Sequence, residues 1–468
     1  MANYYLAVDI GASSGRHILC HRDEAGKLVL QEIHRFPNGM VMKDGRKVWE
    51  IERLWEEIKT GMKKCSALGV VPESIGIDTW AVDYVLLGKD GQRISDAVGY
   101  RDSRTDGIDE AVYKIIPQNR LYAETGIQKQ KFNTIYQLMA EKRDNPELLA
   151  QADCMLLVPD YFHYLLTGKK VAEYTNASTT QLLDPQTKDW HMELIDELGL
   201  PAHIFPHVVP AGTILGELTE EMQKEIGYNT KVIVPGTHDT ASAVVAVPAA
   251  EDEDVLYISS GTWSLMGTEL LKADCSERAG KANFTNEGGY AYRFRFLKNI
   301  MGLWMIQSVK KEIAPDMGFG EICERASKSD IPSTVECNDD RFLAPANMTE
   351  EVQKACAESG QPIPQGIAEV ASVIYNSLAI CYRDTCAEIE SLTGVTYDKI
   401  RVVGGGANAG YLNELTAKFS GKTVLAGPTE ATAIGNIAAQ MIALGEFEDL
   451  FAARACIAES FEIAEYRP

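Results

Sequence analysis

The sequence lacks a membrane-spanning segment and a recognisable export signal. No run of about 18 apolar residues occurs in it, so no transmembrane helix is predicted. The opening stretch MANYYLAVDIGASSGR has no basic leader, and Asp9 interrupts its apolar run, which argues against a secretory signal peptide. We therefore expect a cytoplasmic protein that does not act on a membrane.

The ten cysteines lack the spacing of a metal site or a disulfide framework. They are scattered, with no C-x-x-C pair and no nearby histidine, so neither a zinc cluster nor a disulfide scaffold is indicated. Cys65, Cys381 and Cys386 fall within helical patterns and are predicted to be small core residues. Free thiols of this kind fit a reducing cytoplasm.

Positive charge is scarce. The chain has 45 Lys and Arg against 67 Asp and Glu, a net charge of −22, and such a surface repels nucleic acid and anionic membranes. Small molecules or proteins are the expected partners, and an anionic substrate would need local cations. With 468 residues, of which 45% are hydrophobic and 24% charged, the sequence is typical of a globular protein with two or three domains.

Two common catalytic motifs are also missing. No G-x-x-x-x-G-K-[ST] sequence occurs, which disfavours a P-loop enzyme, and no G-x-S-x-G elbow occurs, which disfavours a serine hydrolase. Any nucleotide or hydroxyl chemistry must therefore depend on another arrangement.

A short pattern occurs twice. YLAVDIGASSGRHIL near the start and VLYISSGTWSLMGTEL from Val255 each join an apolar run to a second run through a glycine and small hydroxylic residues. Asp9 then corresponds to Ser259 and Gly11 to Gly261, an offset of 250 residues. One such turn alone is commonly structural. Its recurrence predicts a duplicated fold with one glycine-turn hairpin in each half.

The rest of each half alternates predicted strands and helices, which indicates α/β sheets covered on both faces. Helices are predicted over 49–65 and 370–389, the latter ending near Gly394. The stretch VPAAEDED, residues 247–254, combines proline with an acidic run and marks the predicted boundary between domains 1–247 and 248–468. A ligand cleft between the two domains would follow from this layout.

The two glycine turns have the composition of phosphate-binding loops. In DIGASSGR, small residues let backbone N–H groups approach phosphate oxygens, Arg16 could add a charged fork, and Asp9 suits a cation held through water. Thr262 lies in the second turn. Near the C-terminus, VVGGGANAG could pass for a dinucleotide fingerprint, but its G-x-G-x-x-x-G spacing also fits a surface for an adenine ring.

The stretch VPGTHDTASAV places His238, Asp239 and Thr240 after a predicted strand and before an alanine-rich helix. Asp239 could cap that helix. It could also be a general base, because a carboxylate is ionised at neutral pH and can accept a hydroxyl proton. Phosphoryl transfer needs mainly positioning, charge neutralisation and one such acceptor.

These residues together resemble the FGGY carbohydrate kinases over essentially the whole chain. The strings that carry the resemblance are DIGASSGR, DTWAVDY, YRDSRT, PDYFHYLLTG, EYTNASTTQL, HDTASAV, SSGTWSLMG, LKNIMGLW and VVGGGANAG. The resemblance implies two duplicated actin/hexokinase-like (ribonuclease H-like) ATPase domains with an interdomain cleft. It also implies transfer of phosphate from ATP, with Mg²⁺, to the 1-hydroxyl of L-rhamnulose, a small-molecule ketose.

The family pattern assigns roles to particular residues. Asp239 would accept the proton and contact the sugar, together with the other predicted sugar ligands Ala81, His238, Thr240 and Asn299. Ala81 stands where the family usually has glycine. Asp9 would hold hydrated Mg²⁺. The predicted ATP-binding residues are Ala12, Ser13, Ser14, Gly15, Arg16, Thr262, Gln307 and Gly405.

Three alternatives remain at this point. The chain could phosphorylate another ketose, such as L-fuculose or a xylulose-like sugar. It could be an ATP-binding regulator of the same fold, with a protein as its partner. An NAD-dependent oxidoreductase would depend on the GGGANAG turn alone.

Overall fold

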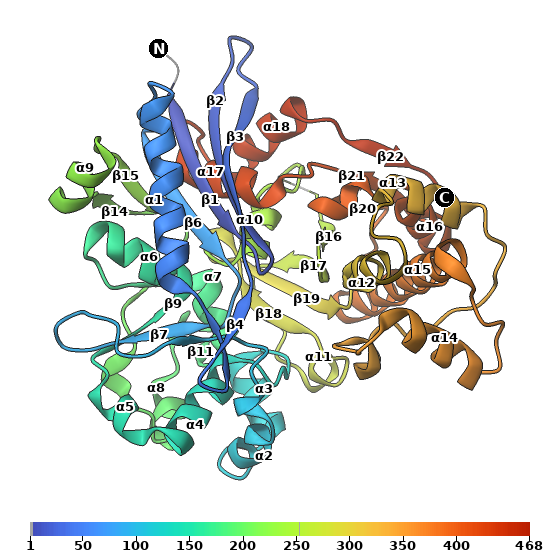
Figure 1. Ribbon diagram of the computed structural model, residues 1–468, viewed down its shortest axis with the longest axis horizontal. Coiled ribbons are helices and arrows are strands. Elements are labelled where there is room, and N and C mark those ends of the chain that lie inside the picture. Colours follow the sequence, from blue (N-terminus) through green and yellow to red (C-terminus); the bar gives the residue numbers. More distant parts are fainter. Residues whose placement is uncertain (1–2, 252) are drawn as a thin grey trace. The chain divides into compact units, whose positions relative to one another are not determined.

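The computed structural model describes residues 3–251 and 253–468, so Asp252 of the predicted acidic boundary lies outside the described residues. Contacts within the chain divide it into two compact units, each of which contains one mixed sheet (Figure 1). The first unit is Met1–Ala246, Leu270–Phe296 and Thr432–Ser460, and the second is Val247–Glu269, Leu297–Ala431 and Phe461–Pro468. The predicted domains 1–247 and 248–468 stay a prediction.

The first unit contains a six-stranded sheet in the order β14-β15-β6-β1-β2-β3. The predicted hairpin is confirmed, because β1 and β2 are antiparallel and Asp9 lies opposite Arg16. Strand β6 is parallel to β1, and β15 is parallel to β6. The strands are β1 (Tyr4–Ile10), β2 (Ser14–Arg22), β3 (Leu28–Pro37), β6 (Ser74–Thr79), β14 (Thr213–Glu217) and β15 (Lys231–Val234).

Helices cover both faces of this sheet, as the sequence predicts. Alternate β1 residues, Leu6 and Val8, pack in one core with apolar side chains of α1 (Ile51–Ala67) and α6 (Val158–Thr167). The opposite face meets α17 (Ala431–Ala443), where a Cβ on Gly76 would lie 2.7 Å from Oδ1 of Asn436. Glycine at this position lets the helix approach the sheet.

The second unit repeats the strand pattern of the first. Strands β17, β16, β20 and β21 adjoin in that order, with β16 antiparallel to β17 and the next two pairings parallel. This is the order β2-β1-β6-β15 of the first unit, so the predicted duplication is confirmed. The strands are β16 (Leu256–Ser260), β17 (Ser264–Leu270), β20 (Lys399–Val403), β21 (Thr423–Ala426) and β22 (Ala464–Tyr466).

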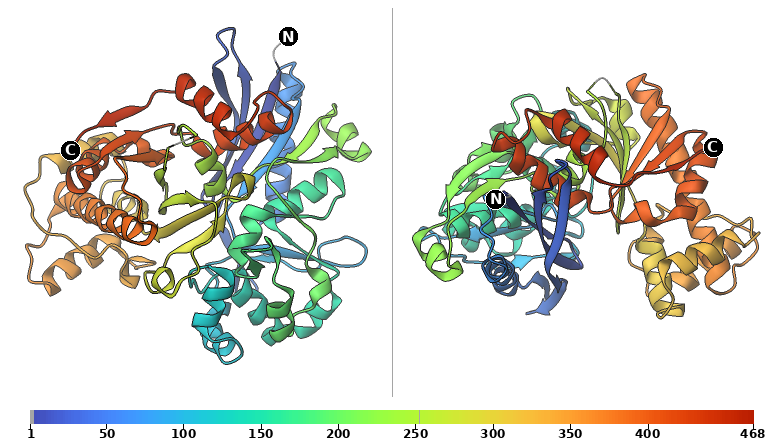
Figure 2. Two further views of the ribbon diagram at one scale, coloured as in Figure 1. Left: turned by 180° about the vertical axis from the view of Figure 1, so that it is seen from behind. Right: turned by 90° about the horizontal axis from the view of Figure 1, so that it is seen from above.

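The longest helix of the second unit is α15 (Gly366–Thr393), and it packs against α16 (Gly410–Ser420), as Figure 2 shows. It ends at Gly394, whose φ of 74° is the left-handed conformation that glycine adopts most easily. The predicted end of this helix is therefore confirmed.

The remaining strands and helices complete the two units. Strand β19 (Phe294–Ile300) begins in the first unit and ends in the second. The other strands are β4 (Met40–Lys43), β5 (Arg46–Trp49), β7 (Tyr84–Leu87), β8 (Ala97–Val98), β9 (Cys154–Leu157), β10 (Ala172–Glu173), β11 (Leu183–Asp184), β12 (Asp189–Trp190), β13 (Val208–Val209) and β18 (Thr285–Gly288). The other helices are α2 (Ile108–Tyr113), α3 (Gln118–Thr125), α4 (Thr134–Asp144), α5 (Pro146–Gln151), α7 (Tyr174–Ala177), α8 (Met192–Glu197), α9 (Glu220–Ile226), α10 (Asp239–Val245), α11 (Glu277–Lys281), α12 (Trp304–Ile313), α13 (Phe319–Ser327), α14 (Met348–Glu358) and α18 (Leu450–Ser460).

The structure also bears on the sequence predictions about membrane spans and cysteines. Within residues 3–251 and 253–468, none of the helices is long and apolar enough to cross a membrane. All ten cysteines are free thiols. The absence of disulfides agrees with the scattered spacing of the cysteines in the sequence.

Candidate active site

The first glycine turn connects β1 to β2. The backbone N–H of Gly11 donates to the carbonyl of Ser14 at 2.9 Å, which closes the turn around Ala12 and Ser13. Gly15 is required by packing, because a Cβ there would lie 2.2 Å from the ring of Phe36. Ser13 is exposed, so backbone groups of this turn are accessible to a ligand.

Arg16 is bound to Asp9 across the hairpin. Its Nε and Nη2 donate to Oδ2 of Asp9 at 3.0 and 2.9 Å, and Asp9 is largely buried. The guanidinium therefore neutralises a buried carboxylate. Contact of Arg16 with a phosphate would come in addition to this ion pair, or would replace it.

Three carboxylates gather where β1, β6 and the start of α10 meet. Asp78 lies opposite Asp9 in the parallel ladder, and a bridge between Thr79 and His238 brings Asp239 to the same edge. Burial raises the pKa of Asp78 well above its ordinary value, and the charges of Asp9 and Asp239 raise it further. The sequence analysis did not single out Asp78, although it is the first residue of the string DTWAVDY.

Asp239 is the first residue of α10, and His238 occupies the N-cap position. The Oδ1 atom of Asp239 accepts hydrogen bonds from the next residue, Thr240, through N at 2.6 Å and Oγ1 at 3.2 Å. An N-cap side chain would instead bond to backbone N–H groups two or three residues ahead. The alternative role of Asp239 as a helix cap is therefore wrong.

The two oxygens of the Asp239 carboxylate differ in their contacts, because Oδ1 accepts both hydrogen bonds from Thr240. The side chain of Asp239 is 32% exposed, and no donor among the described residues contacts Oδ2. Burial raises its pKa above the ordinary value, and the charge of Asp9 raises it further. A carboxylate with a raised pKa is a better proton acceptor near neutral pH.

Glu173 fixes the turn that precedes Asp239. The carboxylate accepts hydrogen bonds from N and Oγ1 of Thr237 at 3.0 and 2.9 Å, and from N of Thr175 at 2.9 Å. Glu173 is completely buried. The sequence analysis missed this role, because Glu173 and Thr237 are distant in the sequence and only the quoted string EYTNASTTQL marked the region.

Ala81 lies near another buried carboxylate, that of Asp83. The indoles of Trp49 and Trp80 donate to Asp83 at 2.7 and 3.0 Å, and Gln137 donates at 2.9 Å. Ala81 has no left-handed φ, whereas Val82 has a φ of 66°. The backbone at position 81 therefore accepts alanine without strain.

In the second unit, the motif LKNIMGLW packs against the second glycine turn. The N–H of Trp304 donates to the carbonyl of Thr262 at 2.9 Å. Gly302 permits this approach, because a Cβ there would lie 2.5 Å from the backbone of Trp263. Asn299 on β19 belongs to this motif, Gln307 on α12 follows it by three residues, and both are partly exposed.

The GGG turn after β20 lies beside the same second hairpin. A Cβ on Gly406 would lie 1.9 Å from Oγ of Ser260, so only glycine permits the contact. Gly405 is exposed, and a Cβ there would meet no atom within 4 Å. The structure thus places the GGG turn against Ser260 of the second hairpin, and it leaves one face of Gly405 open.

The carboxylates fit a hydrated divalent cation. In the described ranges, no group of three His, Cys, Asp or Glu residues is placed to hold a metal ion directly. Asp9 is largely buried beside Asp78, and Oδ1 of Asp78 has no hydrogen-bond partner within these ranges. A carboxyl oxygen without a partner beside a second carboxylate suits Mg²⁺, which usually keeps several waters and one or two carboxylates near phosphates.

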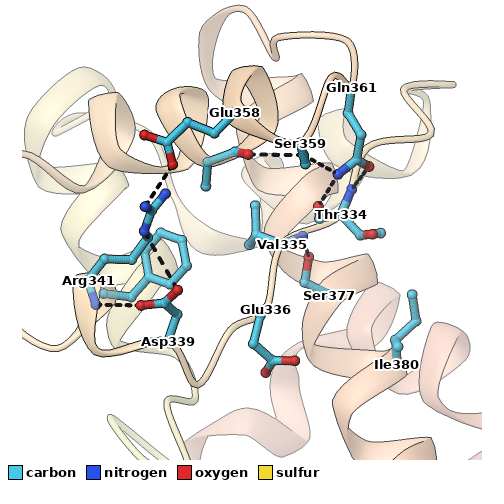
Figure 3. A pocket seen from close by; sticks show the side chains of 12 residues that line it. Thr334, Val335, Glu336, Asp339, Arg341, Glu358, Ser359, Gln361, Ser377 and Ile380 are labelled. Atoms are coloured by element: carbon cyan, nitrogen blue, oxygen red, sulfur yellow. Dashed lines mark hydrogen bonds and ion pairs between the residues drawn. The ribbon is translucent and has the colours of Figure 1, made fainter.

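A pocket of about 530 Å³ occurs elsewhere in the second unit (Figure 3). Its charged side chains are largely paired with one another: Arg341 binds Glu358 at 2.7 Å and also faces Asp339. None of the predicted site residues lines this pocket. We therefore do not assign the predicted chemistry to it.

Comparison with known proteins identifies the family of this chain. Residues 4–246 match the model of the N-terminal domain of the FGGY family of carbohydrate kinases, and residues 256–444 match that of the C-terminal domain. The chain belongs to the FGGY family of carbohydrate kinases, and its fold is the two-domain α/β fold of that family.

Several similar proteins carry a more specific name than that of the family. The chain is 50% identical to the rhamnulokinase of Oceanobacillus iheyensis, over 98% of this chain and 97% of the relative. It is 44% identical to that of Bacillus subtilis, over 99% and 95%. Among solved structures, a ligand-bound xylulose kinase from Lactobacillus acidophilus has a TM-score of 0.81 at 16% identity, covering 100% of this chain and 94% of that one. A Plasmodium falciparum glycerol kinase with ADP has a TM-score of 0.76 at 14% identity, with the same coverage.

Proposed function

We propose that this protein transfers the γ-phosphoryl group of ATP to the 1-hydroxyl of L-rhamnulose, giving L-rhamnulose 1-phosphate and ADP. The observation that carries the proposal is the near-complete alignment, at 41–50% identity, with curated proteins named rhamnulokinase. In this proposal the enzyme acts in the cytoplasm, in the breakdown of L-rhamnose. Family membership argues against the NAD-dependent alternative.

In the proposed reaction, Asp239 is the general base. Thr240 occupies Oδ1 through two hydrogen bonds, so Oδ2 is the atom that accepts the proton of the sugar hydroxyl. As the O–H bond breaks, the sugar oxygen attacks the γ-phosphorus, and the bond from that phosphorus to the ADP oxygen breaks. Ala81, His238, Thr240 and Asn299 are the proposed sugar ligands.

The two glycine turns are proposed to hold the nucleotide. Residues Ala12 to Arg16 and Thr262 would offer donors to phosphate oxygens, Gln307 would contact the nucleotide, and Gly405 would lie against the adenine. Asp9 would hold Mg²⁺ through water, and the bound cation would neutralise charge on the phosphates. In this proposal, residues 1–247 supply the base, most of the sugar ligands and the first phosphate turn, and residues 248–468 supply the second phosphate turn and the surface for the adenine.

The direct test is to incubate the protein with ATP, Mg²⁺ and L-rhamnulose and to follow ADP release together with the ³¹P NMR spectrum. We expect sugar-dependent ADP and a new phosphomonoester signal coupled to the protons on carbon 1. ADP release that is slow and unaffected by any sugar would favour the alternative of an ATP-binding regulator.

A further inference from the structure

His238 lies in a buried cluster that the sequence analysis did not predict. The Nδ1 atom of its ring is 3.1 Å from Nη2 of Arg295 and 3.3 Å from Oε2 of Glu287. Nη2 of Arg295 is in turn 3.0 Å from Oε2 of Glu287. The side chain of His238 is 10% exposed, that of Glu287 is 9% exposed, and that of Arg295 is completely buried. All three residues belong to the first unit.

The guanidinium of Arg295 determines which ring nitrogen of His238 carries the proton. Arginine has only N–H donors and stays charged, so it cannot accept a hydrogen bond. The short contact with Nδ1 therefore requires the lone pair of Nδ1 to face Arg295. The proton of the neutral ring must then be on Nε2.

Glu287 competes for the same nitrogen, but its geometry is poorer. Within the described residues, Oε2 of Glu287 receives no hydrogen bond, although it lies within ion-pair distance of both Arg295 and His238. The carboxylate therefore balances the charge of a buried arginine, which would otherwise be strongly destabilising. Arg295 is anchored a second time, because its Nε donates to the carbonyl of Gly288 at 2.8 Å.

The other side of the ring faces Asp239. Nε2 of His238 lies 3.5 Å from Oδ1 of Asp239, the oxygen that already accepts two hydrogen bonds from Thr240. A proton on Nε2 adds positive potential beside Oδ1 and leaves Oδ2 for the sugar hydroxyl. A ring whose only lone pair faces Arg295 cannot take the hydroxyl proton in place of Asp239.

We propose that Arg295, with Glu287 as its counter-ion, is a positioning residue that holds His238 as the neutral Nε2–H tautomer and so reserves proton acceptance for Asp239. In this inference the role of Asp239 depends on the proposed function, whereas the tautomer of His238 does not. By comparison, an acid that holds a catalytic histidine in the correct tautomer can contribute about 10⁴-fold to kcat.

The first test is the ¹⁵N NMR spectrum of protein labelled at histidine, with the signal of His238 assigned from its absence in His238→Gln. The parent protein is expected to show an unprotonated Nδ1 and a protonated Nε2. Arg295→Met should move the proton to Nδ1, toward Glu287, whereas Arg295→Lys, which keeps a cationic donor, should preserve the parent pattern at least in part. A protonated Nδ1 in the parent would overturn the proposal, and this readout on the parent protein needs no turnover.

The second test separates positioning from binding. Arg295→Met is expected to lower kcat by about ten- to a hundredfold, less than the 10²- to 10⁴-fold that a general base itself contributes, with KM for L-rhamnulose nearly unchanged. Arg401→Met is the matched control, because Arg401 pairs with Glu253 in the second unit and that pair includes no histidine. An unchanged kcat, or a raised KM at constant kcat, would contradict the positioning role. A parent protein that does not phosphorylate L-rhamnulose would refute the proposed function and leave the NMR result standing.

Discussion

At the scale of single residues, the proposed proton transfer depends on one oxygen of Asp239. Asp239→Asn keeps an oxygen that can accept hydrogen bonds from Thr240, but its amide nitrogen cannot accept a proton at neutral pH. We expect kcat to fall by about 10²- to 10⁴-fold, the usual contribution of a general base. Steady-state kinetics, with calorimetry to confirm that sugar and ATP still bind, measure this change. Turnover near the parent rate with intact binding would remove Asp239 as the base.

Gly405 provides a residue-scale test of the nucleotide site. Its missing Cβ faces open space, so Gly405→Ala should leave the melting temperature unchanged. If adenine lies against this turn, the added methyl group should raise KM for ATP several-fold and leave KM for the sugar unaffected. Gly320→Ala on α13 is the control, because a Cβ there also meets no atom within 4 Å. Equal KM values for ATP in both variants would place the adenine elsewhere.

At the scale of elements, two buried amides connect α17 to the first sheet. Gln440 donates to the carbonyl of Leu6 and to Asn436, and it accepts from Ser74. Gln440→Leu would leave three buried polar groups without this partner, and each such loss costs about 1–3 kcal/mol. We expect the free energy of unfolding to fall by about 3 kcal/mol or more.

Chemical denaturation measures this loss. The control is Gln353→Leu, at a partly exposed glutamine on α14 whose amide donates only to the carbonyl of Pro364. The control should cost less than about 1 kcal/mol, because water can replace its hydrogen bond. Equal losses in the two variants would show that the amides on α17 have no special structural role.

Helix α6 contains a carboxyl group whose titration should affect stability. Asp160 is completely buried and accepts hydrogen bonds from N of Glu173. Burial raises its pKa well above the ordinary value, and the charge of Glu173 raises it further. Because the folded state binds this proton more tightly, the resulting stability is present below the unfolded pKa of about 3.9 and is lost as pH rises through the folded value.

Asp160→Asn removes this titration and keeps an oxygen for the backbone N–H. The variant should melt several degrees higher than the parent at pH 8 and only slightly higher at pH 4, since each pKa unit corresponds to about 1.4 kcal/mol. Differential scanning calorimetry at the two pH values measures the difference. The same shift at both pH values, or a less stable variant at pH 8, would contradict the assigned pKa direction.

Sequence patterns predicted the regular elements well. The apolar stripe on α1, the glycine that ends α15 and the two hairpins follow from local periodicity and turn chemistry. The structure confirms all of them. The contacts of Asp78, Glu173, Glu287 and Arg295 could not be predicted in this way, because each depends on a partner far away in the sequence. A local pattern that could have indicated such a contact lies on α17, where the polar residues Asn436 and Gln440 are four residues apart on a largely apolar helix.

At the scale of the whole molecule, the duplicated sheet gives each unit its own glycine turn. In the first unit the turn adjoins Asp9, and Asp78 lies opposite it, whereas in the second unit the equivalent strand ends in Ser259 and Ser260. The carboxylates are thus confined to one copy of the repeat. This asymmetry supports the proposal that one copy performs the acid–base chemistry and the other mainly binds the nucleotide.

The central claim is the identity of the sugar, and one measurement tests it most directly. That measurement is kcat/KM from ADP release with ATP and Mg²⁺ for L-rhamnulose, L-fuculose, D-xylulose, L-ribulose and glycerol, with a sugar-free control. L-fuculose differs from L-rhamnulose only in configuration at carbon 4, and a site that bonds to one hydroxyl can discriminate strongly between such substrates. The account predicts that kcat/KM for L-rhamnulose exceeds every other value by at least about tenfold. A higher value for any other sugar in the panel would contradict it.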